Sequence, residues 1–81
     1  MATPNVETAI QRHFTFLHRL GALDRRGAHL IDPWPIGTAL GMDHDETERT
    51  LASLAQVGWI ERARQPEGDR VALTVWGLAR L

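Results

Sequence analysis

The chain has 81 residues, of which 43% are hydrophobic and 23% are charged, and it contains no cysteine. A chain of this length forms one small domain (residues 1–81), and its core is thin because such a chain buries only about 60% of the surface that its unfolded form exposes. Its size argues against an enzyme with a deep substrate cleft, and the lack of cysteine excludes disulfides and thiolate metal ligands. No apolar run approaches the roughly 18 residues that a membrane span needs, and the first residues are too polar for a signal peptide, so we expect a cytoplasmic protein without a membrane partner.

The charge of the chain is unevenly distributed, and all nine cationic residues are arginines. Segments 1–42 and 58–81 each carry four arginines against three acids, whereas segment 43–57 carries one arginine against four acids. The net charge of −1 therefore conceals an acidic block in the middle of the chain.

The first predicted element is a helix over about residues 4–20. Thr3 is placed to cap it, and Pro4 suits the first helical position, where the N–H that proline lacks would be unpaired anyway. Gly21 is expected to end this helix, and Phe16 lies off its main apolar stripe. The stripe recurs at three- and four-residue steps through Val6, Ile10, Phe14, Leu17 and Leu20.

A connector and a second, short helix follow. Residues 22–34 contain one apolar run, 29–31, which is long enough only for a short strand. Pro35 can open a helix over about 35–40, and Gly41 ends it, since glycine adopts the left-handed conformation without steric cost.

The third helix, over about 44–57, has the clearest start in the chain. Asp43 and Glu46 have the form of a capping box, in which Asp43 accepts at the cap and Glu46 reaches back to the cap N–H. Gly58 is expected to end this helix. Its predicted buried face consists of Thr47, Thr50, Leu51, Leu54 and Val57.

The remaining residues change from helical to alternating periodicity. Two β-prone runs, 59–64 and 70–75, flank a turn that contains Pro66 and Gly68. These features predict a hairpin over about 59–75, followed by a helical stub that ends at Leu81.

The order helix, short strand, helix, tight turn, helix and hairpin is that of a winged helix. The residues that carry a family pattern lie between 34 and 78: Ile36, Leu40, Gly41, Met42, Asp43, Leu51, Leu54, Gly58, Trp59, Ile60, Glu61, Arg62, Leu73, Thr74 and Gly77. In this pattern the chain resembles winged helix-turn-helix transcription regulators of the MarR, ArsR and PadR kind. The resemblance implies an α+β fold with a three-helix core, a short first strand and a C-terminal β-hairpin wing.

The resemblance further implies a small regulator that binds double-stranded DNA and has no catalytic activity. The third helix would lie in the major groove, with Arg49 on a guanine edge and Glu48 accepting from a cytosine amino group. The arginines of the wing would contact phosphates or the minor groove. The complete predicted DNA-binding set is His44, Glu48, Arg49, Ser53, Arg62, Arg64 and Arg70.

The acidic third helix leaves a second interpretation open. Asp45 and Glu48 have no structural role that the sequence explains, and excess acid on a reading helix opposes binding to a polyanion. The alternative is a winged helix that binds a protein and never contacts nucleic acid, either through the acidic face with Asp45 and Glu48 or through an apolar surface supplied by the three tryptophans. In that case the arginines are solvated surface charges. Trp34, Trp59 and Trp76 are expected to be packed or half-buried.

Other site classes find little support in the sequence. The four histidines do not converge as zinc ligands, since His13 and His18 lie on different faces of the first helix. No serine nucleophile stands in a recognisable setting, so we predict no metal, no cofactor and no catalytic site. Because winged-helix regulators dimerise through helices outside the winged core, we expect a homodimer through the first helix, with Phe16 beside His13 or Leu20 as its contact edge, joined by the C-terminal stub.

Overall fold

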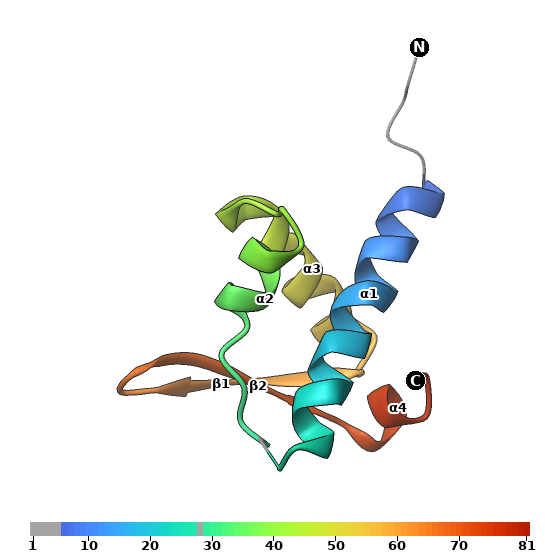
Figure 1. Ribbon diagram of the computed structural model, residues 1–81. Helices are drawn as coiled ribbons and strands as arrows, with labels where there is room; N and C mark the ends of the chain where they lie inside the picture. The colour runs from blue at the N-terminus through green and yellow to red at the C-terminus, as the bar shows by residue number, and fades with distance from the viewer. Residues whose placement is uncertain (1–5, 28) are drawn as a thin grey trace.

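The computed structural model describes residues 6–27 and 29–81 (Figure 1). Within these ranges the chain is α+β, with helices followed by one antiparallel hairpin, as the sequence predicts. The elements in chain order are α1 (Val6–Arg25), α2 (Trp34–Ala39), α3 (His44–Gln56), β1 (Ile60–Gln65), β2 (Gly68–Leu73) and α4 (Val75–Leu78). The tip of the hairpin and α4 lie toward opposite ends of the molecule (Figure 1).

Helix α1 is longer than predicted, because it passes through Gly21 and ends at Arg25. Gly21 is buried, and a Cβ built on it would lie 2.5 Å from Cδ1 of Leu81, so glycine at this position gives the C-terminal side chain room to pack. The left-handed glycine that follows the helix is Gly27, with φ of 94°. The predicted caps Thr3 and Pro4 lie outside the described residues.

The buried face of α1 also differs from the predicted stripe. Phe16, Leu17 and Leu20 are fully buried, whereas Ile10 is 47% exposed. Phe16 is therefore a central core residue, and its predicted place on an outer dimer edge is wrong. The core is completed by residues from the connector, α2, the turn after it, α3 and the hairpin: Ile31, Ile36, Met42, Leu51, Leu54, Ile60 and Val71.

The junction of α2 and α3 follows the sequence closely. Gly41 has φ of 74°, which permits the sharp turn between the two helices, and the Asp43 side chain accepts a hydrogen bond of 2.7 Å from the Glu46 N–H. The other half of the capping box is wrong, because the Glu46 carboxylate contacts Arg12 of α1 instead. At the other end of α3, Val57 is 58% exposed and lies off the buried face on which it was predicted.

The hairpin has the predicted position and a tighter turn. Gln65 pairs with Gly68, so only Pro66 and Glu67 connect the strands. At its inner end Val71 is fully buried and exchanges two backbone hydrogen bonds of 2.8 Å with Ile31. The predicted strand over 29–31 is thus a single antiparallel bridge from Ile31 to Val71, which ties the connector to β2.

Two of the three tryptophans lie where the sequence predicts. Trp34 and Trp59 are half-buried against the core, but Trp76 on α4 is 71% exposed. Among the described residues, none of the helices combines the length and apolar character needed to cross a bilayer.

Candidate nucleic-acid interface

The outer face of α3 is largely exposed to solvent, whereas its inner face forms part of the core. Thr47, Thr50, Leu51 and Leu54 are buried. On the other side of the helix, His44, Asp45, Arg49 and Ala52 are exposed, and Glu48 and Ser53 are partly so. A single helix therefore packs along one face and presents polar side chains along the other, which is the arrangement a groove-binding helix needs.

The first residue of α3 is held by an aromatic contact. The His44 ring stacks on the Trp34 ring at the start of α2, with centroids 4.5 Å apart and planes 6° from parallel. The His44 side chain is still 76% exposed, so its polar edge remains open to solvent. This stacking fixes the position of an imidazole at the N-terminal end of the helix.

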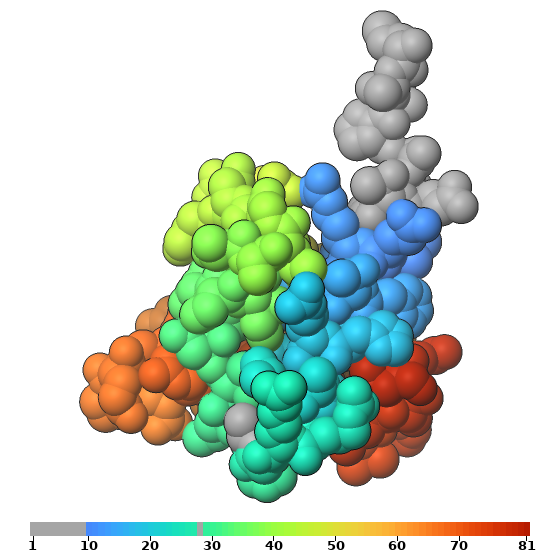
Figure 2. Space-filling model, in the orientation of Figure 1, coloured from blue at the N-terminus to red at the C-terminus, as the bar shows by residue number. Residues whose placement is uncertain are grey.

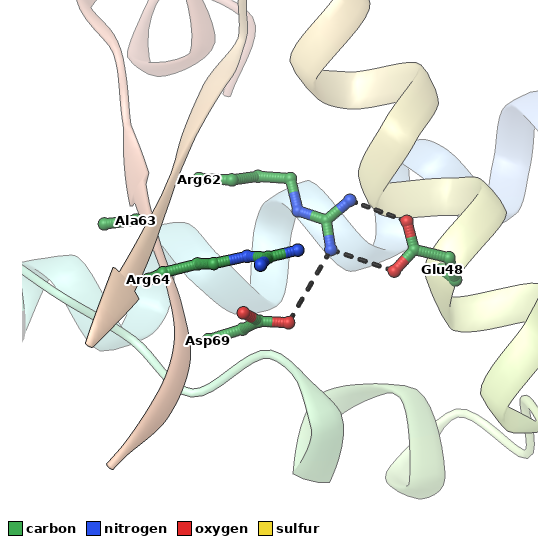
Figure 3. Close-up of a pocket in the computed structure, with 5 residues that line it drawn as sticks. All are labelled: Glu48, Arg62, Ala63, Arg64 and Asp69. Atoms are coloured by element: carbon green, nitrogen blue, oxygen red, sulfur yellow. Dashed lines mark hydrogen bonds and ion pairs between the residues drawn. The ribbon is translucent and has the colours of Figure 1, made fainter. Parts of the chain in front are cut away.

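The central contact of the site joins α3 to β1. Arg62 donates two hydrogen bonds to Glu48, of 2.6 Å from Nη1 to Oε2 and 2.9 Å from Nη2 to Oε1 (Figure 3). Nη2 also lies 3.9 Å from Oδ2 of Asp69 on β2. The hydrogen bond from Arg62 lowers the pKa of the Glu48 carboxyl, and the same bond raises the pKa of the Arg62 guanidinium.

The strand register explains why these residues meet. Arg62 lies opposite Val71, and Arg64 lies opposite Asp69. Alternation along β1 puts Arg62 and Arg64 on the same face as the buried Ile60, while Ala63 points the other way (Figure 3). The face of the hairpin that is apolar near the core is therefore charged farther out, where it lies opposite α3.

These charged side chains line a hollow of about 510 Å³ between α3 and the hairpin. Its lining residues are Glu48, Arg62, Ala63, Arg64 and Asp69. Arg64 is exposed, and its guanidinium extends toward the hollow (Figure 3). Arg70 is turned back to its own strand, where Nη1 donates a hydrogen bond of 2.8 Å to the carbonyl of Asp69.

The fold partly neutralises the acidic block of the sequence. Asp43 caps α3, Glu46 contacts Arg12, and Glu48 pairs with Arg62. Asp45 is 86% exposed, and its Oδ1 lies 3.9 Å from Nδ1 of His44. Two arginines from outside segment 43–57 therefore offset charge that the linear sequence assigns to α3 alone.

The structure thus divides the predicted DNA-binding residues into three groups. Glu48, Arg62 and Arg64 come together at the hollow, and the first two bind each other. Three others, His44, Arg49 and Ser53, lie along α3, and Arg70 lies apart on β2. Sequence reasoning missed the role of Arg12, which follows from the crossing of α1 over the start of α3 and has no local signal. It also missed the contact between Glu48 and Arg62. A signal for this contact was present, because the alternation Ile60, Arg62, Arg64 places both arginines on the same face of β1 as the core residue Ile60.

Within the described ranges, no three histidine, aspartate or glutamate side chains converge as metal ligands would. Figure 2 shows the hairpin tip as a lobe that stands out from the helical body. Comparison of the chain with protein-family models, with curated protein sequences and with solved structures gives no match.

Proposed function

We propose that the chain is a winged helix-turn-helix domain that binds double-stranded DNA as a small transcription regulator and has no catalytic activity. In this proposal α3 enters the major groove and the hairpin β1–β2 is the wing. The observation that carries it is the uncovered polar face of α3 beside a projecting arginine-bearing hairpin. A cytoplasmic location belongs to the same proposal, since the target is DNA.

The charge distribution in the folded chain supports this function better than the sequence does. Pairing of Glu46 with Arg12 and of Glu48 with Arg62 lessens the repulsion that α3 would exert on a phosphate backbone. The pairing also occupies Arg62, so the wing contact with phosphate or the minor groove falls chiefly to Arg64. Arg49, exposed on the outer face of α3, has the length and the planar fork to read a guanine edge.

The remaining contacts follow from position. His44 lies in the first turn of α3, where recognition helices meet base edges, and its stacking on Trp34 limits the freedom it would lose on binding. Ser53, two turns farther along, is placed for a phosphate. Arg70 supplies long-range positive charge rather than a directed contact, because Asp69 holds its guanidinium.

Binding as a homodimer is part of the proposal. With Phe16 in the core, the exposed side of α1 offers Ile10, and α4 offers Val75 and Trp76, which are 76% and 71% exposed. A dimer through α1 joined by α4 would double the number of phosphate contacts. Sedimentation that shows only monomer at high concentration would contradict this part of the proposal without touching DNA binding itself.

The test is fluorescence anisotropy with a labelled random duplex over a series of salt concentrations starting at about 50 mM. We expect binding that weakens steadily with salt, because each neutralised phosphate contributes about 0.9 to the slope of log K against log salt. The absence of binding to any duplex at the lowest salt would overturn the proposed function.

The protein-binding alternative is favoured by one observation, the exposure of Val75 and Trp76 on α4. A large aromatic side chain exposed beside an aliphatic one is a typical interface anchor. Its acidic element is now Asp45, because Glu48 is paired within the chain. Stoichiometric capture of a protein partner that is lost on Trp76→Ala, by a chain that binds no duplex, would select this alternative.

A further inference from the structure

The two ends of the hairpin are held by different interactions. At the inner end, Ile60 and Val71 are buried in the core, and Val71 is bridged to Ile31. The outer half, which we define as residues 63–70, has no buried residue along its length. An isolated two-stranded hairpin is at best marginally stable in water, so burial does not fix the direction of this outer half.

The cluster Glu48–Arg62–Asp69 stands at the boundary between these halves and joins three elements. Arg62 on β1 is bound by both carboxylate oxygens of Glu48 on α3 and lies within 3.9 Å of Asp69 on β2. Two parallel hydrogen bonds between planar groups fix orientation as well as distance. Among the described residues, α3 and the hairpin share no side-chain hydrogen bonds other than these two.

We infer that Glu48 and Arg62 are positioning residues, which hold the outer half of the hairpin at a fixed angle to α3 so that Arg64 meets the DNA backbone while α3 lies in the groove. This inference rests on the proposed function. Arg64 lies two residues beyond Arg62 on the same face of β1, so the fork that fixes Arg62 also fixes Arg64. In this role Arg62 does not itself bind DNA, and Glu48 assists binding although it is negatively charged.

The negative charge of Glu48 makes the inference testable by the sign of one effect. If Glu48 merely repels phosphate, Glu48→Gln removes a negative charge, frees Arg62 and tightens duplex binding. If Glu48 positions the hairpin, the same substitution weakens binding, by about twofold. The matched control is Asp45→Asn, one turn from Glu48 on the same helix, which removes an 86% exposed carboxylate and should tighten binding.

A second pair of variants separates geometry from charge. Arg62→Lys keeps the positive charge, which suffices for a phosphate contact, but loses the fork. Positioning predicts that it weakens binding about as much as Glu48→Gln. The double variant Glu48→Gln/Arg62→Lys should bind about as well as either single variant, because both act on one interaction.

A measurement on the protein without DNA tests whether Glu48 holds the hairpin, independently of whether the protein binds DNA. Amide ¹⁵N relaxation should show lower order parameters for residues 63–70 in Glu48→Gln than in the unaltered chain, and unchanged values in Asp45→Asn. If the unaltered chain binds no duplex, the proposed function fails, and this measurement alone decides whether the cluster holds the hairpin. Tighter duplex binding by Glu48→Gln, or unchanged order parameters in residues 63–70, would overturn the inference.

Discussion

The inner end and the outer half of the hairpin differ in what holds them, although they belong to the same two strands. Inner residues such as Ile60 and Val71 are almost completely buried and pack with α1 and α3. At the boundary of the outer half, Arg62 joins Glu48 of α3 and lies within 3.9 Å of Asp69. Apolar burial stabilises the inner end strongly but without a preferred direction. The ion pair fixes a direction but contributes little free energy, because it lies at an exposed site.

This difference leads us to expect that stability and the proposed duplex binding can be altered separately. Substitutions at the inner end should act on the free energy of unfolding, and substitutions in the outer half should act on duplex binding. The same division applies to α3, whose inner face is core and whose outer face is polar.

The largest expected effect is that of Ile60→Ala. Ile60 is 2% exposed, and its truncation should lower the free energy of unfolding by about 2–5 kcal/mol, through lost burial and the cavity left behind. Urea denaturation followed by circular dichroism measures it. Arg64→Ala, on the same face of the same strand, is the control and should change stability by no more than about 0.5 kcal/mol. Equal losses from the two variants would erase the contrast between the halves.

Gly37→Ala tests close packing between α2 and α3. A Cβ on Gly37 would lie 2.1 Å from Oγ1 of Thr47, which is 2% exposed and donates to the carbonyl of Asp43. Overpacking of this kind should cost about 1–3 kcal/mol, seen as a lower midpoint of urea unfolding. Ala39→Ser, at an exposed position of α2, should leave the midpoint nearly unchanged. An unaltered midpoint for Gly37→Ala would show that the helices separate without cost.

Arg49→Ala and Arg64→Ala should each weaken duplex binding by about threefold to tenfold without loss of stability. Their salt dependence should differ. Loss of a phosphate contact at Arg64 lowers the slope by about 0.9, whereas loss of a base contact at Arg49 reduces discrimination between duplex sequences. Arg26→Ala, which removes an exposed arginine after α1, is the control for general charge. If Arg26→Ala binds as weakly as the other two variants, all three arginines contribute only non-specific electrostatic attraction to the duplex.

The smallest expected effect is a pH dependence of the ion pair. The pKa of Glu48 is below its ordinary value of 4.5, chiefly because Arg62 donates to it and in small part because of His44. A depressed carboxyl pKa stabilises the fold above that ordinary value, and the contribution disappears as the pH falls through the folded-state pKa. The unaltered chain should therefore exceed Glu48→Gln in stability by at most about 0.5 kcal/mol at neutral pH, because the Glu48 side chain is 44% exposed and its charge is screened. The gap should close below pH 4.5, and a gap that widens there would contradict this account.

Local features of the fold were predictable because their causes lie within a few residues. Asp43 caps α3, Gly41 and Gly58 adopt positive φ, and the turn at Pro66 and Glu67 joins two paired strands. Each depends on one side chain or one backbone conformation, which the sequence displays directly. The α+β order of elements follows from these signals together with the periodicities.

The sequence misled wherever a distant residue decided the outcome. Gly21 did not end α1 but lies within it, in contact with Leu81 from the other end of the chain. Phe16 was assigned to the outer surface by spacing alone, yet the elements that pack against α1 cover it. Because helical spacing identifies a stripe but not the width of the surface that covers it, the true buried face was offset from the predicted one.

By itself the sequence determined the start of α3, the glycine turns on either side of it and the hairpin, and which side chains carry charge. Only the tertiary structure decided which charges meet. Glu46 is 34 residues from Arg12, and Glu48 is 14 residues from Arg62. Such pairs form because the burial of apolar residues brings their elements together, so no local pattern announces them. The electrostatic character of α3, and with it the case for DNA, is therefore a property of the fold rather than of the segment.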